Sequence, residues 1–354
     1  FDCTKNPACT CAPYAVQCMK AAMKTPHASP FVVVSSPGMH ETAEVVLRIV
    51  REKHGLEVPH QRARFDYFAN GEAVVHIPET VRRQHVFFFH PLQHPSPNDA
   101  VMTMLITHDA LLRASAAGIT LVAPYVPYLR QDRKDRPRRP ITARMLADII
   151  QSNRCVERII TADMHADQEQ GFFSIPVDNL TSTTLFASHF ARELGEKVKD
   201  VVVVAPDFGG AVRARRFAAK LGDAPVAIFE KRRPHANHSE VVALVGESVE
   251  GRITIIYDDM IDTGGTIRGV AGELAKRGAR EVYICATHGI FSGGAEEKFR
   301  AEGVRVLTTD SIPREDAYRA AHADWLSIVS MNDLLAEAIF EASLVGGSIS
   351  KLMG

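Results

Sequence analysis

The sequence predicts an α/β fold with two lobes, each a mostly parallel sheet flanked by helices. From about Pro30 onward, short apolar runs rich in β-branched residues alternate with stretches of roughly 10–15 residues that have helical periodicity, which is typical of βαβ units. The length of 354 residues is a little over twice the ~150 residues of an average domain, so two domains are expected.

Strands are expected where β-branched and aromatic residues form a short apolar run between turn residues. The expected strands are Phe31–Val34, Val86–Phe89, Ile119–Pro124, Arg158–Asp163, Val201–Ala205, Val226–Phe229, Ile253–Tyr257, Glu281–Thr287 and Val304–Thr308. A weaker alternating run, Ala73–Ile77, is expected to pair antiparallel at a sheet edge. The expected helices are Glu41–Lys53, Asp99–Ala117, Thr142–Asn153, Thr183–Leu194, Ala211–Leu221 and Thr266–Arg277.

The domain limits follow from these elements. A polar, proline-containing stretch at Pro176–Thr181 separates a first lobe, residues 30–178, from a second lobe, residues 179–334. Residues 1–29 are an unassigned N-terminal extension, and their cysteines Cys3, Cys9, Cys11 and Cys18 lack the paired spacing of a structural zinc site. Cys155 and Cys285 lie in apolar contexts and are expected to be buried thiols.

Composition and charge exclude several classes of partner. The chain has 41 Lys and Arg against 42 Asp and Glu, so its net charge of −1 gives no overall field that would attract nucleic acid or an anionic membrane. The longest apolar runs are far shorter than the ~20 residues of a membrane helix, and no segment has the pattern of a secretion signal. We expect a soluble, cytoplasmic protein that binds neither nucleic acid nor membrane.

The segment Ile253–Thr266 carries the strongest functional pattern, a buried strand followed by three aspartates and a Thr-Gly-Gly-Thr turn that opens a helix. Glycines allow backbone N–H groups to approach an anion, and a helix N-terminus adds partial positive charge, so residues 262–266 form a cradle for a phosphomonoester. Asp258 and Asp259 suit sugar hydroxyls or a Mg²⁺ ion bound to the sugar. A purely structural acidic loop would explain one aspartate but not the whole string.

The segment Val201–Ala211 repeats the order of strand, acidic loop, double glycine and helix. Gly209 and Gly210 can present backbone donors to a diphosphate, and Asp207 can hold Mg²⁺ against it. Taken alone this is a weak pattern, and it gains weight only beside the first one.

The segment Tyr125–Arg144 contains a strongly basic run between an expected strand and an expected helix. Six cations and two aspartates lie between Arg130 and Arg139, a local charge of +4. Such a run is usually a solvated loop, but this one lies at the carboxyl edge of the sheet, where ligands bind. Guanidinium groups bind phosphates bidentately and stack on adenine, so ATP is the expected ligand.

Two further places add candidate groups. Lys231 and Arg233 follow the expected strand Val226–Phe229, where they could supply positive charge to a phosphoryl group in transfer. His165 follows the strand Arg158–Asp163, and a neutral imidazole there could bind a metal ion that also contacts ATP. The non-functional alternatives are that Lys231 and Arg233 belong to an ordinary basic turn and that His165 has a structural role.

These segments closely resemble the ribose-phosphate pyrophosphokinases (phosphoribosyl pyrophosphate synthetases) over roughly Asp66 to Leu352. The resemblance implies two phosphoribosyltransferase-type lobes, with the C-terminal residues 335–354 returning to the first lobe. It also implies homo-oligomers, built from dimers and extending to hexamers, in which a neighbouring subunit contributes to ATP binding. The implied reaction transfers the β,γ-diphosphoryl group of ATP to the 1-hydroxyl of ribose 5-phosphate with Mg²⁺.

The resemblance assigns roles to individual residues. Lys231 and Arg233 would be catalytic, and His165 and Asp207 would bind metal. ATP would be bound by Phe68, Asn70, Glu72, Arg130, Gln131, Asp132, Arg133, Lys134 and His165. Ribose 5-phosphate would be bound by Asp258, Asp259, Asp262, Thr263, Gly264, Gly265 and Thr266, and the diphosphate loop would be Asp207, Gly209 and Gly210.

Two of the departures of the sequence from the family pattern bear on nucleotide binding and regulation. The adenine-contacting motif Phe-Ser-Asp-Gly-Glu is Phe68-Ala-Asn-Gly-Glu72 here, so an amide replaces a carboxylate and nucleotide preference is open. The Ser-Thr-Ser stretch that binds a regulatory phosphate is replaced by His90–Asn98, whose prolines lack N–H donors. We therefore expect weak inhibition by ADP at a separate site, although protonated His90 or His94 would restore positive charge.

Two other functions remain open from the sequence. One is a catalytically silent, pyrophosphokinase-associated subunit, which the presence of Lys231, Arg233, His165 and the basic loop disfavours. The other is a phosphoribosyltransferase, which would not need a basic ATP loop.

Overall fold

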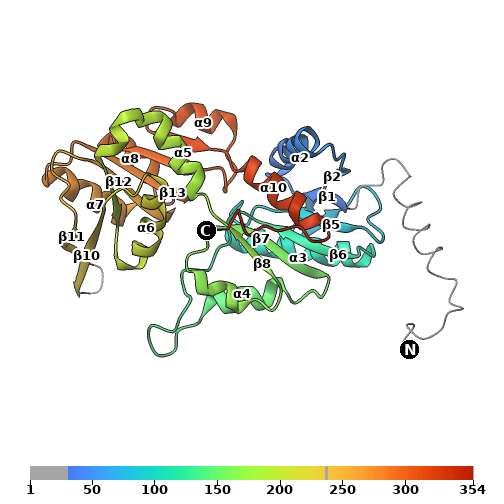
Figure 1. Cartoon of the computed structure of the whole chain (residues 1–354). Coiled ribbons are helices and arrows are strands. Elements are labelled where there is room, and N and C mark those ends of the chain that lie inside the picture. The colour runs from blue at the N-terminus through green and yellow to red at the C-terminus, as the bar shows by residue number, and fades with distance from the viewer. Residues whose placement is uncertain (1–30, 236–237, 354) are drawn as a thin grey trace, which may run out of the picture.

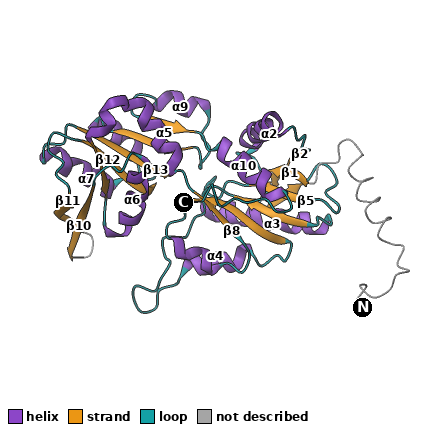
Figure 2. Ribbon diagram, in the orientation of Figure 1, coloured by secondary structure: helices purple, strands orange, loops and turns teal. Residues whose placement is uncertain are grey.

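The computed structural model describes residues 31–235 and 238–353, and side chains are described outside residues 231–242. Figure 1 and Figure 2 show two α/β lobes joined side by side, and the structure adds one small hairpin. The predicted fold class is confirmed.

The first lobe is built on a six-stranded sheet in the order β2-β1-β5-β6-β7-β8. All five neighbouring pairs are parallel. The strands are β1 (Phe31–Ser35), β2 (His60–Arg62), β5 (His85–Phe89), β6 (Gly118–Val122), β7 (Val156–Ala162) and β8 (Val177–Leu180). The chain then passes to the second lobe through Thr181 and Ser182.

Both faces of the first sheet are buried, which explains why its strands have continuous apolar sequences. Along β1, Val32 and Val34 face one core, whereas Phe31 and Val33 face the other. The first core is covered by α3 (Pro97–Arg113) and α4 (Thr142–Ile150). The second is covered by α2 (His40–His54) and by the C-terminal α10 (Asn332–Ser343), which pack against each other.

The second lobe contains a seven-stranded sheet in the order β11-β10-β9-β12-β13-β14-β15. It is parallel except for the antiparallel pair β10 and β11. The strands are β9 (Val201–Ala205), β10 (Val226–His235), β11 (His238–Gly246), β12 (Ile253–Ile261), β13 (Glu281–Gly289), β14 (Arg305–Thr309) and β15 (Leu326–Val329).

Helices again cover both faces of this sheet. One core lies beneath α5 (Thr183–Leu194) and α6 (Ala211–Lys220), and the other lies beneath α7 (Gly265–Lys276) and α8 (Ala295–Glu302). The short α9 (Asp316–His322) contacts β15. The described part of the chain also contains the 3₁₀ turns η2 (Asp167–Phe172), η3 (Gly195–Asp200) and η4 (Phe208–Gly210).

The C-terminal segment crosses back to the first lobe after β15. Leu335, Ala336 and Ile339 of α10 are fully or almost fully buried in the core shared with α2. Beyond α10, Met353 forms an antiparallel bridge with Leu180 at the end of β8. The last described residues therefore lie beside the junction between the lobes.

Two sequence predictions need correction. The alternating run forms β4 (Ala73–His76), which is antiparallel as expected, but it pairs with β3 (Arg64–Tyr67) in a separate two-stranded sheet and not at the edge of the main sheet. The strand expected at Val226–Phe229 continues to His235, because β11 pairs with its second half and extends it into a hairpin. The thiols of Cys155 and Cys285 are free and buried, as expected.

The expectation that His90 could carry a positive charge is wrong. Its imidazole is buried, and burial lowers its pKa to about 4. Its Nε2 atom lies 2.8 Å from the carbonyl oxygen of Ala100, and its Nδ1 atom lies 2.6 Å from the hydroxyl of Ser36. His90 is thus a neutral group of the core, held by two hydrogen bonds.

Candidate active site

A polar cleft of roughly 1000 Å³ lies where the carboxyl ends of β7, β9 and β12 meet. Ligands bind at this edge of open α/β sheets. The cleft is lined by residues of four segments that the sequence had singled out: Arg130, Asp132 and Arg133; His165; Asp207, Gly209 and Gly210; and Asp258, Asp259 and residues 262–266. The structure therefore brings most of the predicted site residues together.

Two adjacent aspartates at the end of β12 form the acidic centre of the cleft. Asp258 and Asp259 fall inside the strand, which continues beyond Tyr257 because it pairs with β13 as far as Gly289. The Nη1 atom of Arg213, on α6, lies 3.2 Å from Oδ1 of each aspartate. The guanidinium thus supplies the positive charge that two neighbouring buried carboxyl groups require.

The two aspartates differ in their ionisation. Burial raises the pKa of Asp258 well above its ordinary value, and the charge of Asp259 adds to the shift. Burial also acts to raise the pKa of Asp259, but the hydrogen bond from His165 and the charge of Arg213 outweigh it and lower that pKa. Asp259 therefore ionises before Asp258.

His165 reaches across from the first lobe to this pair. Its Nδ1 atom lies 2.7 Å from Oδ2 of Asp259. That hydrogen bond raises the pKa of His165 above its ordinary value. Arg213 reinforces the same contact, because its Nη2 atom donates to the carbonyl oxygen of His165 at 2.9 Å. Arg213, from the second lobe, thus binds both the backbone of His165 and its hydrogen-bond partner Asp259.

The loop between β12 and α7 has the geometry of a phosphate cradle. Gly264 has a φ of +71° at the start of α7, and a Cβ atom there would lie 2.5 Å from Cζ of Phe299. The left-handed turn falls at Gly264 and not at Gly265. At Gly265 a Cβ would meet only the hydroxyl of Thr263, at 3.9 Å. The turn leaves the N-terminus of α7 open to the cleft.

The loop after β9 forms a second glycine turn that opens onto the cleft. Asp207 accepts a hydrogen bond from the backbone N–H of Gly210 at 3.2 Å, which fixes the turn η4 ahead of α6. Gly209 and Gly210 line the same cleft as the residue 262–266 cradle. Two anion-binding turns on one cleft can hold two phosphate groups of different substrates.

The basic loop before α4 extends from the first lobe as an open loop (Figure 1), and Arg130, Asp132 and Arg133 in its first half line the cleft. Arg130 donates to Oδ2 of Asp262 at 2.6 Å, and Gln168 donates to Oδ2 of Asp132 at 3.1 Å. Gln131 and Lys134 are exposed and do not line the cleft. The structure thus brings the first half of the loop to the site.

The predicted adenine-contacting residues lie elsewhere. Phe68, Asn70 and Glu72 form the turn between β3 and β4, where the N–H of Phe68 donates to the carbonyl oxygen of Glu72 at 2.8 Å. Phe68 is 61% exposed, and none of the three lines the cleft. The cleft of one chain is therefore without the residues that were expected to hold the nucleotide base.

Lys231 and Arg233 lie in the second half of β10, where Lys231 is in register with Val241 of β11. They were expected to follow the strand, but the hairpin extends β10 so that both lie within it. Their side chains lie outside the described part of the structure.

The donor set of the cleft fits Mg²⁺. Asp207 offers carboxylate oxygens and His165 an imidazole, although no group of three His, Cys, Asp or Glu residues gathers in metal-binding geometry within 31–235 or 238–353. Mg²⁺ usually keeps several waters and takes one or two carboxylates together with substrate phosphates. A sparse protein ligand set is therefore what a phosphate-bridging Mg²⁺ needs.

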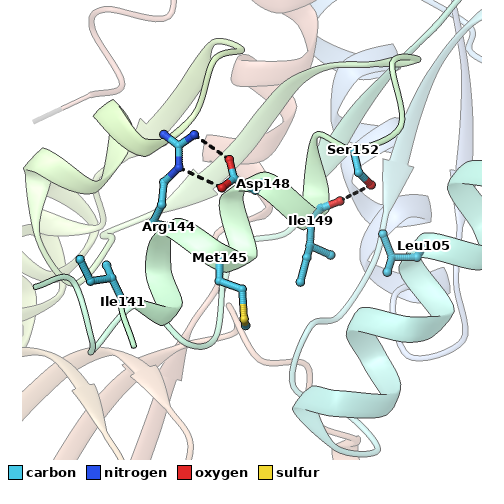
Figure 3. A pocket seen from close by; sticks show the side chains of 7 residues that line it. All are labelled: Leu105, Ile141, Arg144, Met145, Asp148, Ile149 and Ser152. Carbon is cyan, nitrogen blue, oxygen red and sulfur yellow. Dashed lines mark hydrogen bonds and ion pairs between the residues drawn. The ribbon is translucent and has the colours of Figure 1, made fainter. Parts of the chain in front are cut away.

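A second hollow, of about 730 Å³, lies against α3 and α4 (Figure 3). It is lined by Leu105, Ile141, Arg144, Met145, Asp148, Ile149 and Ser152. Its charged groups are paired with each other, since Arg144 contacts Asp148 at 2.8 Å. The polar cleft is the better candidate for chemistry.

Sequence reasoning missed Arg213 and Asp163, both of which line the cleft. Arg213 follows Gly210 by three residues, so its place on the first turn of α6 was a signal that went unused. Asp163 gave no such signal, because its partners come from distant segments.

Comparison with known proteins agrees with this architecture. The family model described as the N-terminal domain of ribose phosphate pyrophosphokinase matches residues 32–153, and the phosphoribosyl transferase domain model matches residues 176–321. The chain is 44% identical to the ribose-phosphate pyrophosphokinase of Fusobacterium nucleatum over 291 residues, which cover 82% of this chain and 89% of that protein.

Two further relatives extend the comparison. The Vibrio cholerae ribose-phosphate pyrophosphokinase is 46% identical over 275 residues, covering 77% of this chain and 85% of that protein. The crystal structure of phosphoribosylpyrophosphate synthetase from Mycobacterium smegmatis superposes with a TM-score of 0.77 at 35% identity, covering 88% of this chain and 98% of that one. With two domain models in order and identities above 40% over most of its length, this chain belongs to the ribose-phosphate pyrophosphokinase family.

Proposed function

We propose that the protein is a Mg²⁺-dependent ribose-phosphate diphosphokinase. It transfers the β,γ-diphosphoryl group of ATP to the 1-hydroxyl of ribose 5-phosphate, giving phosphoribosyl pyrophosphate and AMP. The supporting observation is the single cleft that joins a basic loop of the first lobe to two anion-binding turns of the second. In the reaction the sugar oxygen bonds to the β-phosphorus, the bond to the α-phosphate oxygen breaks, and one proton is released.

Each segment of the cleft has a part in this reaction. Residues 262–266 hold the 5-phosphate at the N-terminus of α7, and Asp258 and Asp259 accept hydrogen bonds from the ribose hydroxyls. The loop of Asp207, Gly209 and Gly210 receives the diphosphate. Arg130, Gln131, Asp132, Arg133 and Lys134 bind ATP from the first lobe, where guanidinium groups suit its phosphates. Holding both substrates in one orientation supplies much of the rate acceleration.

Lys231 and Arg233 stabilise the moving diphosphoryl group. Charge develops on the transferred phosphates during the reaction, and cations placed there lower the barrier more than they strengthen substrate binding. Mg²⁺ would be held by Asp207 and His165. It neutralises phosphate charge when bound.

A neighbouring subunit completes the nucleotide site. Phe68, Asn70 and Glu72 do not line the cleft of their own chain. This supports the proposal that they bind adenine in the site of another copy, within a dimer-built homo-oligomer that extends to a hexamer. The domains of this subunit are 30–178 with 335–354, and 179–334.

The setting is the cytoplasm. No helix in 31–235 or 238–353 is long and apolar enough to cross a membrane. Binding of nucleic acid or membrane is not part of the proposed function.

One assay tests the proposal. The protein is incubated with ribose 5-phosphate, Mg²⁺ and ATP labelled in the β-phosphate, and products are separated by chromatography. Diphosphokinase activity gives AMP and labelled phosphoribosyl pyrophosphate in equal amounts. Absence of AMP would indicate the silent subunit. Formation of a nucleotide from phosphoribosyl pyrophosphate and a free base, without consumption of ATP, would indicate a phosphoribosyltransferase.

A further inference from the structure

The chain turns sharply where β7 leaves the first sheet. β7 ends at Ala162, and the next residue, Asp163, has a φ of +37°, a conformation that costs free energy for a residue with a Cβ atom. Such strain persists only where the surroundings hold it in place. His165 follows two residues later, so the direction in which it leaves the sheet depends on this turn.

The carboxylate of Asp163 is held by donors from the segment that joins the lobes and from the second lobe. Its Oδ2 atom accepts from the backbone N–H of Ser182 at 2.9 Å, from the Ser182 hydroxyl at 2.5 Å and from the Thr287 hydroxyl at 2.7 Å. Thr287 lies on β13, and Ser182 immediately precedes α5, whose apolar face packs in the second-lobe core. Both hydroxyl residues are fully buried.

The backbone at the same point is held from the same side. The Nε2 atom of His288, on β13, lies 3.1 Å from the carbonyl oxygen of Ala162 and 3.3 Å from that of Asp163. Because it faces two acceptors, Nε2 carries the proton, and the Nδ1 atom lies 2.9 Å from the hydroxyl of Ser311. The end of one first-lobe strand is thus fastened to the second lobe through both its side chain and its main chain.

We propose that Asp163 is a positioning residue that sets the two lobes relative to each other, so that groups of the first lobe meet those of the second. Its oxygens are occupied by protein donors, so it acts through those partners and not by direct contact with substrate. The fastening lies at the base of the cleft, beside the point where His165 meets Asp259.

The consequence for catalysis rests on the proposed function. ATP is bound mainly from the first lobe and ribose 5-phosphate from the second, so each lobe can hold its own substrate even when their relative placement is loose. The reacting atoms then fail to align, and a misplacement of about 1 Å can cost on the order of 10²-fold in rate. Loosening the fastening should lower kcat with little change in either KM.

The main test substitutes the carboxylate and its partners separately. Asp163→Asn keeps the shape of the side chain but replaces one carboxylate oxygen, so that an amide N–H₂ or a single oxygen faces the three donors. Ser182→Ala and Thr287→Val remove the two hydroxyl donors instead. Asp178→Asn is the matched control, because Asp178 is also buried but pairs with Arg158 inside the first sheet, at 2.6 Å. We expect kcat to fall at least tenfold in Asp163→Asn, and KM values to stay within about threefold.

A direct measurement of lobe placement accompanies the kinetics. Spin labels are attached through an unnatural amino acid at Glu52 on α2 and Lys276 on α7, both exposed, and the distance distribution is recorded by pulsed electron resonance in the full-length protein. We expect a broader distribution in Asp163→Asn and in Thr287→Val than in the unsubstituted protein, and no broadening in Asp178→Asn.

The outcomes separate this inference from the proposed function. If the unsubstituted protein forms no AMP, the proposed function fails, and the distance measurement still decides the inference. An unchanged distance distribution in Asp163→Asn overturns the inference about Asp163. So does a loss of activity that disappears when the assay temperature is lowered well below the unfolding transition, since that result would indicate a stability defect only.

Discussion

The Nδ1 atom of His165 lies 2.7 Å from the carboxylate of Asp259, and this hydrogen bond joins the two lobes inside the cleft. Arg213 contacts both ends of it, through the Asp259 carboxylate and the His165 carbonyl oxygen. The three groups are therefore one unit, and the arginine supplies positive charge beside the Asp259 carboxylate.

Arg213→Met is expected to destabilise the protein strongly. The substitution leaves Asp258 and Asp259 buried and adjacent without their counter-charge, and breaking a buried ion pair in this way costs about 3–5 kcal/mol. Urea unfolding measures the loss. Arg216→Met, on the same helix, removes a half-exposed pair with Asp167 and should cost about 1 kcal/mol or less. Asp258→Asn added to Arg213→Met should restore part of the stability; equal losses for the two arginine variants would contradict this account.

Glu169→Gln is expected to stabilise the protein at pH 8 and to have little effect at pH 5. Glu169 is fully buried, its Oε1 atom has no hydrogen-bond partner among the described residues, and burial raises its pKa from 4.5 to about 7. A carboxyl group whose folded pKa is raised contributes full stability below pH 4.5 and loses it as the pH rises through 7.

The measurement for Glu169→Gln is the thermal unfolding midpoint across this pH range. The glutamine cannot ionise, so the difference between the two proteins should grow from pH 5 to pH 8, reaching about 1–3 kcal/mol. A difference that does not vary with pH would show that the Glu169 carboxyl is not responsible. Glu247→Gln, at an exposed position, serves as the control.

The two glycines of the phosphate cradle should respond differently to substitution. Gly264→Ala forces a left-handed residue to carry a Cβ against Phe299, so both stability and affinity for ribose 5-phosphate should fall. Gly265→Val meets no such obstacle in the protein and should raise the KM for ribose 5-phosphate at least tenfold while leaving the unfolding midpoint nearly unchanged. Calorimetry with each substrate checks the assignment, and equal losses of ATP affinity would assign the loop to the other ligand.

Lys231→Ala is expected to lower kcat by roughly 10²–10³-fold, with substrate affinities within a few fold, because the charge is needed chiefly in the transition state. Steady-state kinetics gives the comparison, and Lys220→Ala at the exposed end of α6 is the control. Unchanged turnover in Lys231→Ala would show that Lys231 is not a catalytic residue.

ADP is expected to inhibit mainly by competition with ATP. Pro91 and Leu92, in the stretch for which the family resemblance implied a regulatory phosphate site, are buried, and His90 stays neutral near pH 7. Inhibition at rising ADP should therefore be overcome by saturating ATP. Strong inhibition that persists at saturating ATP would show that another phosphate site works.

Much of the fold could be predicted because its strands are buried on both faces. Runs such as Val201–Ala205 leave no other interpretation, and the structure gives the same bounds. The edge strands β2, β8, β11 and β15 escaped prediction because they are short, polar or extended by a partner, and their pairing depends on neighbours distant in sequence. At the site, the glycine turns were visible as motifs, whereas Arg213 and Asp163 acquire their roles through contacts with residues distant in sequence.

Because α10 returns to the first lobe, the lobe that is synthesised first is not the lobe whose core is completed first. The sheet of the first lobe leaves the ribosome first, yet the α2 face of its core is closed only by a helix made after the entire second sheet. Until then Val46, Val50 and Phe87 lack part of their apolar cover, and such exposed surface favours aggregation. The lobe that forms first is thus the one that matures last.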